Sequence, residues 1–364
     1  MHTPLPVHLI TGLLGSGKTT CLKQLITQKP ATENWLVIIN EFGEVDIDAS
    51  HLSSLDHPQN ALNIQAVSGG CICCTAQIGL VSTINQQLTR SKDSEQAFDR
   101  IWIEPTGLGH PAKIIDALQN SQFAQPLALQ KIVCVITPQQ LTQERWQKST
   151  VMRDLVTLAD TIILNKTDLS DDAALSQALH ILQQCYPPKT DITQTQNGVI
   201  ALDGLLQPPT KKPFCILTHP QKQPCKLAPN HLNMDSHQHQ STNSQLSYPS
   251  RITATKHCFI SENQQSKGRE LLSMGWIWNA DVQFNRVLLK RFFEQIAPSL
   301  IRAKGIIKTG KEWQLINWSD GQLKFEDIAW RQDSRLECLF DESQNNKLDA
   351  ETVETWLIES IHHF

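Results

Sequence analysis

The stretch Gly12-Leu13-Leu14-Gly15-Ser16-Gly17-Lys18-Thr19-Thr20 lies between the apolar run 7–10 and a segment whose apolar residues recur at helical spacing. This order predicts a strand, a loop and a helix, which is the setting of a phosphate-binding loop. Glycine at positions 12, 15 and 17 permits the backbone angles with which N–H groups close around phosphate oxygens, and a helix N-terminus adds partial positive charge. The stretch therefore predicts a nucleoside triphosphate as the ligand.

The side chains of this loop have predicted roles of their own. We expect Lys18 to reach the β- and γ-phosphates and the Thr19 hydroxyl to ligate Mg²⁺. Together with Glu104, further along the chain, these two residues form the predicted catalytic set. The predicted phosphate-contacting residues are Gly12, Gly15, Ser16, Gly17, Lys18, Thr19 and Thr20.

A second motif indicates which base the nucleotide carries. The apolar run 161–164 ends in Asn165-Lys166-Thr167-Asp168, the guanine-reading pattern of P-loop GTPases when it follows a strand. The Asp168 carboxylate can accept hydrogen bonds from the ring N–H and the amine of guanine, whereas adenine would leave those acceptors unpaired. Asn165 is expected to brace the loop and Lys166 to lie along the base. The pattern favours GTP over ATP.

A third motif lies between these two. The segment 98–107 is an apolar strand that ends in Glu104 and is followed by Gly107. An acid beside the phosphate-binding loop holds the magnesium ion or its water in P-loop enzymes, and the Gly107 N–H is expected to sense the γ-phosphate. No glutamine or arginine that would accelerate hydrolysis can be assigned from the sequence. We therefore expect slow intrinsic GTP hydrolysis.

Three thiols stand close together in Gly69-Gly70-Cys71-Ile72-Cys73-Cys74, between the apolar run 35–39 and the strand that ends at Glu104. This interval normally holds a switch segment of GTPases. Cys71, Cys73 and Cys74 can supply three thiolates to one soft cation, with Zn²⁺ the commonest, and leave a fourth position open. Glu41 and Glu44 are nearby acids that could add an oxygen ligand, or could be ordinary loop residues exposed to solvent.

The competing interpretation of this cluster is a disulfide or a redox relay. The chain has ten cysteines and no secretory signal, which indicates a reducing compartment where thiol clusters usually bind metal or carry out redox chemistry. This favours metal binding. The remaining cysteines stand among apolar residues and are expected to be packing residues: Cys21, Cys134, Cys185, Cys215, Cys225, Cys258 and Cys338.

The order of these motifs resembles the CobW-like P-loop GTPases over nearly the whole chain. That family consists of metallochaperones or insertases that couple GTP hydrolysis to delivery of zinc, cobalt or iron, and the zinc branch looks closest. The resemblance implies metal ligation by Cys71, Cys73 and Cys74, magnesium binding beside Glu104, and base reading by Asn165 with Asp168. It also implies a client metalloprotein as partner and GTP, Mg(II) and Zn(II) as ligands.

The chain departs from the family pattern in two places. The apolar run 131–136 is usually followed by an aspartate, and here Thr137-Pro138 stands in its place. A dense histidine tract is reduced to scattered residues between His219 and His257. These histidines could gather metal weakly or belong to a plain connector.

Composition excludes several classes of function. The net charge of −4 and the lack of a basic stripe give no electrostatic case for binding nucleic acid or an anionic membrane. The N-terminal residues do not resemble a signal peptide, and no apolar segment reaches membrane-spanning length. We expect a cytoplasmic protein, and the sequence leaves open whether it is a homo-oligomer.

Alternating strands and helices predict an α/β fold for residues 1–207, a P-loop NTPase domain with a mostly parallel sheet. Residues 208–250 are polar and predict a linker. Residues 251–364 resemble the CobW C-terminal domain, a smaller α+β unit, with a helix over 284–296, strands near 305–307, 313–316 and 336–339, and a final helix near 353–361. The tryptophans there, such as Trp276 and Trp278, either fill its core, the interpretation we favour, or form a surface for a client.

The resulting hypothesis is a GTP-hydrolysing metallochaperone in which the thiol cluster, lying in the switch interval, is ordered by GTP with Mg²⁺ and relaxed after hydrolysis. Two alternatives remain. One is a guanine-nucleotide-switched binding protein with a structural zinc. The other is a cobalt chaperone for cobalamin synthesis, although thiolate ligands favour zinc.

Overall fold

The computed structural model describes residues 3–41, 62–68, 75–93, 97–105, 111–207, 257–266, 269–341 and 349–362. The chain forms two compact units, one of Met1–Lys212 with Ala329–Arg331 and the other of Pro213–Ile328 with Gln332–Phe364. The predicted linker 208–250 lies outside the described residues. The predicted domain limits at 207 and 251 stay predictions.

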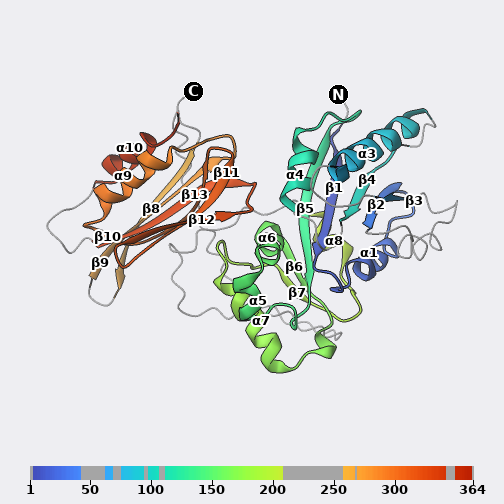
Figure 1. Ribbon diagram of the computed structural model, residues 1–364, viewed down its shortest axis with the longest axis horizontal. Helices are drawn as coiled ribbons and strands as arrows, with labels where there is room; N and C mark the ends of the chain where they lie inside the picture. Colours follow the sequence, from blue (N-terminus) through green and yellow to red (C-terminus); the bar gives the residue numbers. More distant parts are fainter. Residues whose placement is uncertain are drawn as a thin grey trace, which may run out of the picture. The chain divides into compact units, whose positions relative to one another are not determined.

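The first unit is built on a parallel seven-stranded sheet (Figure 1). Its order is β3-β2-β4-β1-β5-β6-β7, and every neighbouring pair runs parallel. The sequence-based expectation of a P-loop α/β domain is therefore confirmed. The strands are β1 (Leu5–Gly12), β2 (Trp35–Glu41), β3 (Leu62–Ser68), β4 (Arg100–Glu104), β5 (Leu127–Ile136), β6 (Thr161–Leu164) and β7 (Ile192–Gln194).

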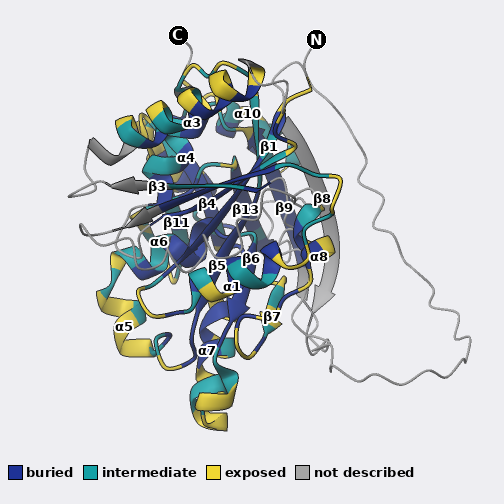
Figure 2. Ribbon diagram, turned by 90° about the vertical axis from the view of Figure 1, so that its right-hand side faces the viewer, coloured by how far each residue is buried: buried dark blue, intermediate teal, exposed yellow. Residues whose placement is uncertain are grey.

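The central strands are apolar on both faces because helices cover both sides of the sheet. Val7 and Leu9 of β1 belong to one core cluster, and Ile10 belongs to another, as expected when successive side chains project to opposite faces. Burying each such side chain contributes about 1.5–3 kcal/mol. In Figure 2 the strands β1, β4 and β5 are mostly buried, whereas α5 and α7 present exposed faces.

Side-chain caps fix where several helices of this unit begin. Thr142, Ser149 and Asp171 each accept a hydrogen bond from a backbone N–H three residues later. Within the described ranges, no helix is long and apolar enough to span a membrane. The helices are α1 (Lys18–Ile26), α3 (Thr75–Asp93), α4 (Pro111–Asn120), α5 (Gln143–Lys148), α6 (Thr150–Leu158), α7 (Asp172–Gln184) and α8 (Leu202–Leu206), with a 3₁₀ turn η1 (Thr167–Leu169).

The second unit is an antiparallel six-stranded sheet with helices α9 (Arg286–Ile296) and α10 (Ala350–Ile358). The expected α+β class is confirmed, and both predicted helices are present. The strand order is β12-β11-β10-β13-β9-β8. The strands are β8 (His257–Ser266), β9 (Arg269–Asn279), β10 (Leu300–Thr309), β11 (Glu312–Ser319), β12 (Gln322–Ile328) and β13 (Asp333–Asp341).

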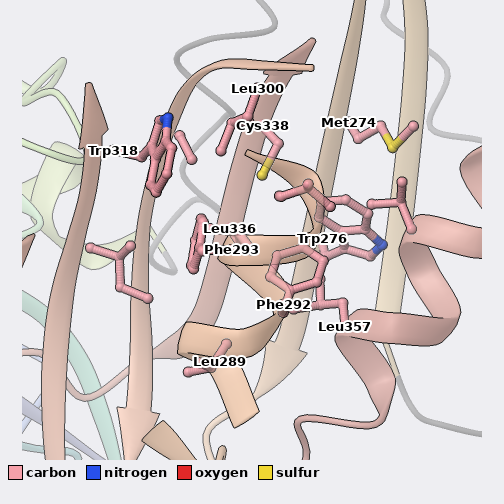
Figure 3. Close-up of a cluster of buried hydrophobic side chains, with 14 of the residues drawn as sticks. Met274, Trp276, Leu289, Phe292, Phe293, Leu300, Trp318, Leu336, Cys338 and Leu357 are labelled. Carbon is pink, nitrogen blue, oxygen red and sulfur yellow. The ribbon is translucent and has the colours of Figure 1, made fainter. Parts of the chain in front are cut away.

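Aromatic side chains fill the core of the second unit (Figure 3). Trp276 is fully buried, and Trp278 is only 1% exposed. Phe293 of α9 stacks on Trp318 of β11 with ring centroids 6.0 Å apart. For Trp276 and Trp278, packing in the core is the interpretation that the structure confirms over a client surface.

Candidate nucleotide-binding site

The predicted phosphate-binding loop joins the carboxyl end of β1 to the first residue of α1. Two of its glycines leave no space for a side chain, because a Cβ on Gly12 would lie 2.0 Å from the Val135 carbonyl oxygen and one on Gly17 would lie 2.3 Å from Asn165 Nδ2. Both residues also have positive φ, 144° and 97°. Gly17 caps α1 without a side chain, which leaves the first N–H groups of the helix available to an anion.

Two buried polar groups of this loop fit an anionic ligand. Lys18 is only 7% exposed, and its Nζ donates to the Leu13 carbonyl oxygen at 3.2 Å. Ser16 Oγ is buried and has no hydrogen-bond partner within the described residues. A phosphate oxygen would satisfy the Ser16 hydroxyl and compensate the lysine charge.

The predicted magnesium corner joins α1 to β4. Thr19 Oγ1 donates to Glu104 Oε1 at 2.7 Å, and Glu104 is only 4% exposed at the end of β4. Because β4 is the direct neighbour of β1, this carboxylate lies beside the phosphate-binding loop. A hydroxyl and a carboxylate oxygen are hard donors of the kind that Mg²⁺ prefers, so this pair fits the ion.

The predicted base-reading motif follows β6 and is tied to the phosphate-binding loop. Asn165 Nδ2 donates to the Ser16 carbonyl oxygen at 2.9 Å, and Lys166 Nζ donates to the Gly15 carbonyl oxygen at 2.8 Å. Asn165 is 1% exposed, while Asp168 is exposed in η1. The structure thus brings the two predicted motifs together and leaves the Asp168 carboxylate accessible to a base.

The turn after β7 is part of this corner, and the sequence analysis missed it. Gly198 N donates to Asn165 Oδ1 at 3.0 Å, so the amide oxygen is also bonded. Asn197 and Gly198 both have positive φ, and a Cβ on Gly198 would lie 2.8 Å from Cys21 N. The dipeptide Asn197-Gly198 is a turn signal from which this loop could have been predicted.

The segment Thr137-Pro138 replaces an aspartate in the pattern that the chain resembles, and the structure shows how the turn is closed without it. Gln140 N donates to the Thr137 carbonyl oxygen at 3.0 Å and lies 3.3 Å from Thr137 Oγ1. The Thr137 hydroxyl thus accepts within its own turn, as an aspartate carboxylate can.

The predicted metal ligands are mostly outside what the structure describes. Cys71, Cys73, Cys74 and Glu44 lie outside the described residues, as does the predicted γ-phosphate sensor Gly107. The backbone of Glu41 ends β2, two residues after Ile39, which pairs in register with Glu104. Within the described part of the chain, no group of three or more histidine, cysteine or acidic residues could hold a metal ion.

Three further cysteines are packing residues, as expected. Cys21, Cys134 and Cys338 are fully buried. Burial, reinforced by the Glu104 charge, raises the pKa of the Cys21 thiol to about 12. Burial alone raises the pKa of Cys134 to about 12, against opposing effects of Lys189, Thr11 and Lys18. Thiols held protonated in this way are poor metal ligands, because metal binding requires the thiolate.

Comparison with known proteins agrees with this geometry. Residues 6–194 match the nucleotide-binding domain of CobW/HypB/UreG, and residues 273–353 match the C-terminal domain of the cobalamin synthesis protein cobW. The zinc chaperone YeiR of Escherichia coli K12 is 29% identical over 334 residues, covering 91% of this chain and 92% of YeiR.

Two other known proteins are similar to this chain. The zinc-regulated GTPase metalloprotein activator 1 of Schizosaccharomyces pombe is 30% identical over 175 residues, 48% of this chain and 41% of that protein. The Zn(II)-bound YjiA GTPase from E. coli aligns over 99% of both chains with 18% identity and a TM-score of 0.42. On the match that spans residues 6–194, this chain belongs to the CobW/HypB/UreG family of nucleotide-binding proteins.

Proposed function

We propose that this GTPase is a metallochaperone that binds Zn(II) through Cys71, Cys73 and Cys74 and delivers it to client proteins. The observation that supports it best is the hydrogen bond of Thr19 to Glu104 at the carboxyl end of β4. β3 ends at Ser68 and is parallel to β2, so the last described residue before the thiol segment 69–74 lies at the same end of the sheet as Glu104. The name of YeiR, a zinc chaperone, supports the choice of metal.

In this proposal each part of the nucleotide corner has one task. Lys18 and the N–H groups of the loop hold the phosphates, and Asp168 selects guanine. Thr19 and Glu104 hold Mg²⁺, which when bound neutralises charge on the β- and γ-phosphates. Because no water-positioning residue can be assigned from the sequence, we expect slow hydrolysis.

The γ-phosphate is the proposed link to the metal. Because the thiol segment 69–74 and Gly107 both follow strands that end at the same edge, we infer that the γ-phosphate orders both segments. Its loss on hydrolysis then relaxes the thiolates and releases the zinc to a client. A cytoplasmic location suits this chemistry, since a reducing thiol pool keeps the three cysteines available.

The coupling is tested by measuring Zn²⁺ affinity with GDP and with a non-hydrolysable GTP analogue. Tighter zinc binding with the analogue is expected, and equal affinities would contradict the coupling because allostery is a difference in free energy between the two states. Cys73→Ser should weaken zinc binding and spare GTP binding. Lys18→Ala is the matched variant: it should weaken nucleotide binding and leave the thiols able to hold zinc.

Delivery needs a separate measurement, because a structural zinc would also respond to mutation of the cysteines. Zinc content should fall during GTP turnover in the presence of an acceptor chelator. Zinc that stays bound through many turnovers would favour the alternative, a nucleotide-switched binding protein whose zinc is structural.

A further inference from the structure

Four successive carbonyl groups of the phosphate-binding loop each accept a hydrogen bond from a side chain. These pairs are Leu13 with Lys18 Nζ at 3.2 Å, Leu14 with Gln140 Nε2 at 2.8 Å, Gly15 with Lys166 Nζ at 2.8 Å and Ser16 with Asn165 Nδ2 at 2.9 Å. Lys18 belongs to the loop motif, and Asn165 and Lys166 belong to the base-reading motif. Gln140 belongs to neither, and no predicted role accounts for it.

The orientation of these carbonyls determines where the loop N–H groups point. In a trans peptide the C=O and the following N–H lie in one plane and point in opposite directions. The donor that holds the Leu14 oxygen therefore fixes the direction of the Gly15 N–H, which points to the opposite side of the peptide, away from Gln140. Gly15 has φ of 74°, and its N–H is among those expected to contact phosphate. Gln140 is thus the donor that orients this peptide.

The Gln140 amide is itself held at both ends. Its Oε1 accepts from Thr137 N at 3.2 Å, while its Nε2 donates to the Leu14 oxygen. Because a backbone N–H can only donate, this bond fixes which end of the amide is oxygen and leaves the nitrogen facing the loop. The neighbouring Gln139 Nε2 donates to the Leu169 carbonyl oxygen at 2.5 Å, which ties the same turn to the end of the base-reading motif.

We infer that Gln140 is a positioning residue for phosphate binding. It acts through the Leu14–Gly15 peptide of the phosphate-binding loop and has no part in reading the base. This inference rests on the proposed nucleotide binding. The inference assigns a function to the turn after β5, in which Thr137-Pro138 stands where the family pattern has an aspartate.

The test compares binding of GDP and IDP by titration calorimetry in the full-length chain. IDP lacks the exocyclic amine of guanine, so the ratio of the two Kd values reports recognition of the base. A change in both Kd values by the same factor reports binding of the phosphates. Gln140→Met removes the donor without adding charge and should raise both Kd values roughly threefold. Gln140→Glu sets a carboxylate against the Leu14 oxygen and should raise both roughly tenfold or more. The GDP to IDP ratio should stay at the wild-type value in both variants.

Two control variants separate this role from general damage. Gln130→Glu makes the same change in the amino-terminal half of β5, whereas Gln140 follows that strand, and this variant should bind as the wild type does. Asp168→Asn removes an acceptor for the ring N–H, which both nucleotides carry, and for the amine, which only guanine carries, so this variant should change the GDP to IDP ratio. Thermal unfolding of each variant verifies that the first unit is folded.

Three outcomes would overturn the inference: wild-type affinities in Gln140→Glu, an altered GDP to IDP ratio in that variant, or wild-type affinity in Gln140→Met with loss only in Gln140→Glu. The last result would indicate charge repulsion of the phosphates instead of a lost hydrogen bond. If the wild-type chain bound neither nucleotide, the proposed function would fail before Gln140 was tested.

Discussion

Asn165 links the base-reading motif to the phosphate-binding loop. Its side-chain amide donates to the Ser16 carbonyl oxygen and accepts from Gly198 N, at 2.9 and 3.0 Å. A brace at this position could be predicted from the sequence, because the motif that contains Asn165 follows a strand. Its second partner could not, since Gly198 lies 33 residues later in a turn whose neighbours in space depend on the sheet order.

The environment of His8 could not be predicted from the sequence. It stands in an apolar strand, is fully buried, and stacks on Trp102 with ring centroids 4.3 Å apart. Its Nε2 lies 2.8 Å from an Arg100 nitrogen, and because arginine can only donate, the ring nitrogen accepts. Burial, with the Arg100 charge, lowers the pKa of His8 from 6.5 to about 3.

The low pKa of His8 predicts a loss of stability in mild acid. Between pH 6.5 and 3 the unfolded chain binds a proton at His8 and the folded chain does not, so the free energy of unfolding falls as the pH falls through this window. From pH 7 to pH 5 this residue should account for about 2 kcal/mol. In His8→Gln, the free energy of unfolding measured by urea titration should fall by about 2 kcal/mol less between pH 7 and pH 5 than in the wild type. His180→Gln, at an exposed histidine, is the control. If the free energy of unfolding of His8→Gln depended on pH as it does in the wild type, His8 would not be the source of this loss of stability.

At the scale of elements, the strands that could be predicted are those that are apolar on both faces. The runs 7–10, 35–39 and 131–136 correspond to β1, β2 and β5, which are longer, and the run 161–164 corresponds to β6. The edge strands were missed, because an edge strand need not be apolar on both faces. β3 carries Asn63 and Gln65, β7 is three residues long, and β12 alternates with exposed residues. As a result the thiol segment follows a third strand that the sequence analysis did not identify.

Helix α9 depends on its N-cap for a defined start. Asn285 Oδ1 accepts from Val287 N at 2.9 Å and Leu288 N at 3.3 Å, and α9 buries Leu289, Phe292, Phe293 and Ile296 beyond it. Asn285→Ala should therefore lower the free energy of unfolding of the second unit by about 1 kcal/mol. Asn285→Asp keeps the acceptor and should lose much less in the same denaturant titration. Equal losses in the two variants would show that the cap bonds do not matter.

The whole molecule consists of two units with separate cores. The buried cluster of the second unit contains only residues from Leu272 to Leu357, and those of the first contain residues from Leu5 to Leu205. The order of units and their classes could be predicted from motifs and periodicity. The pairing of Ala329–Arg331 with the first unit could not, because no motif marks a return of the chain.

Separate cores predict separate effects of a core mutation. Phe293→Ala removes a fully buried ring from the second unit and should cost about 3–5 kcal/mol there. Calorimetry should show a lowered transition for that unit, while GDP still raises the transition of the first unit. Leu25→Ala, in α1, is the matched change in the first unit. It should lower the transition of the first unit and leave that of the second unit unchanged. A Phe293→Ala chain that no longer binds GDP at temperatures where both units are folded would contradict this independence.

The position of β1 in its sheet also bears on how the chain is made. β1 is synthesised before both of its neighbours, β4 and β5, which end more than ninety residues later in the sequence. At ordinary rates of translation the apolar residues of β1 remain without their neighbours for on the order of ten seconds. The nascent chain therefore carries its phosphate-binding loop throughout this interval before Gln140 and Asn165, whose side chains bond the loop carbonyl groups, have been made.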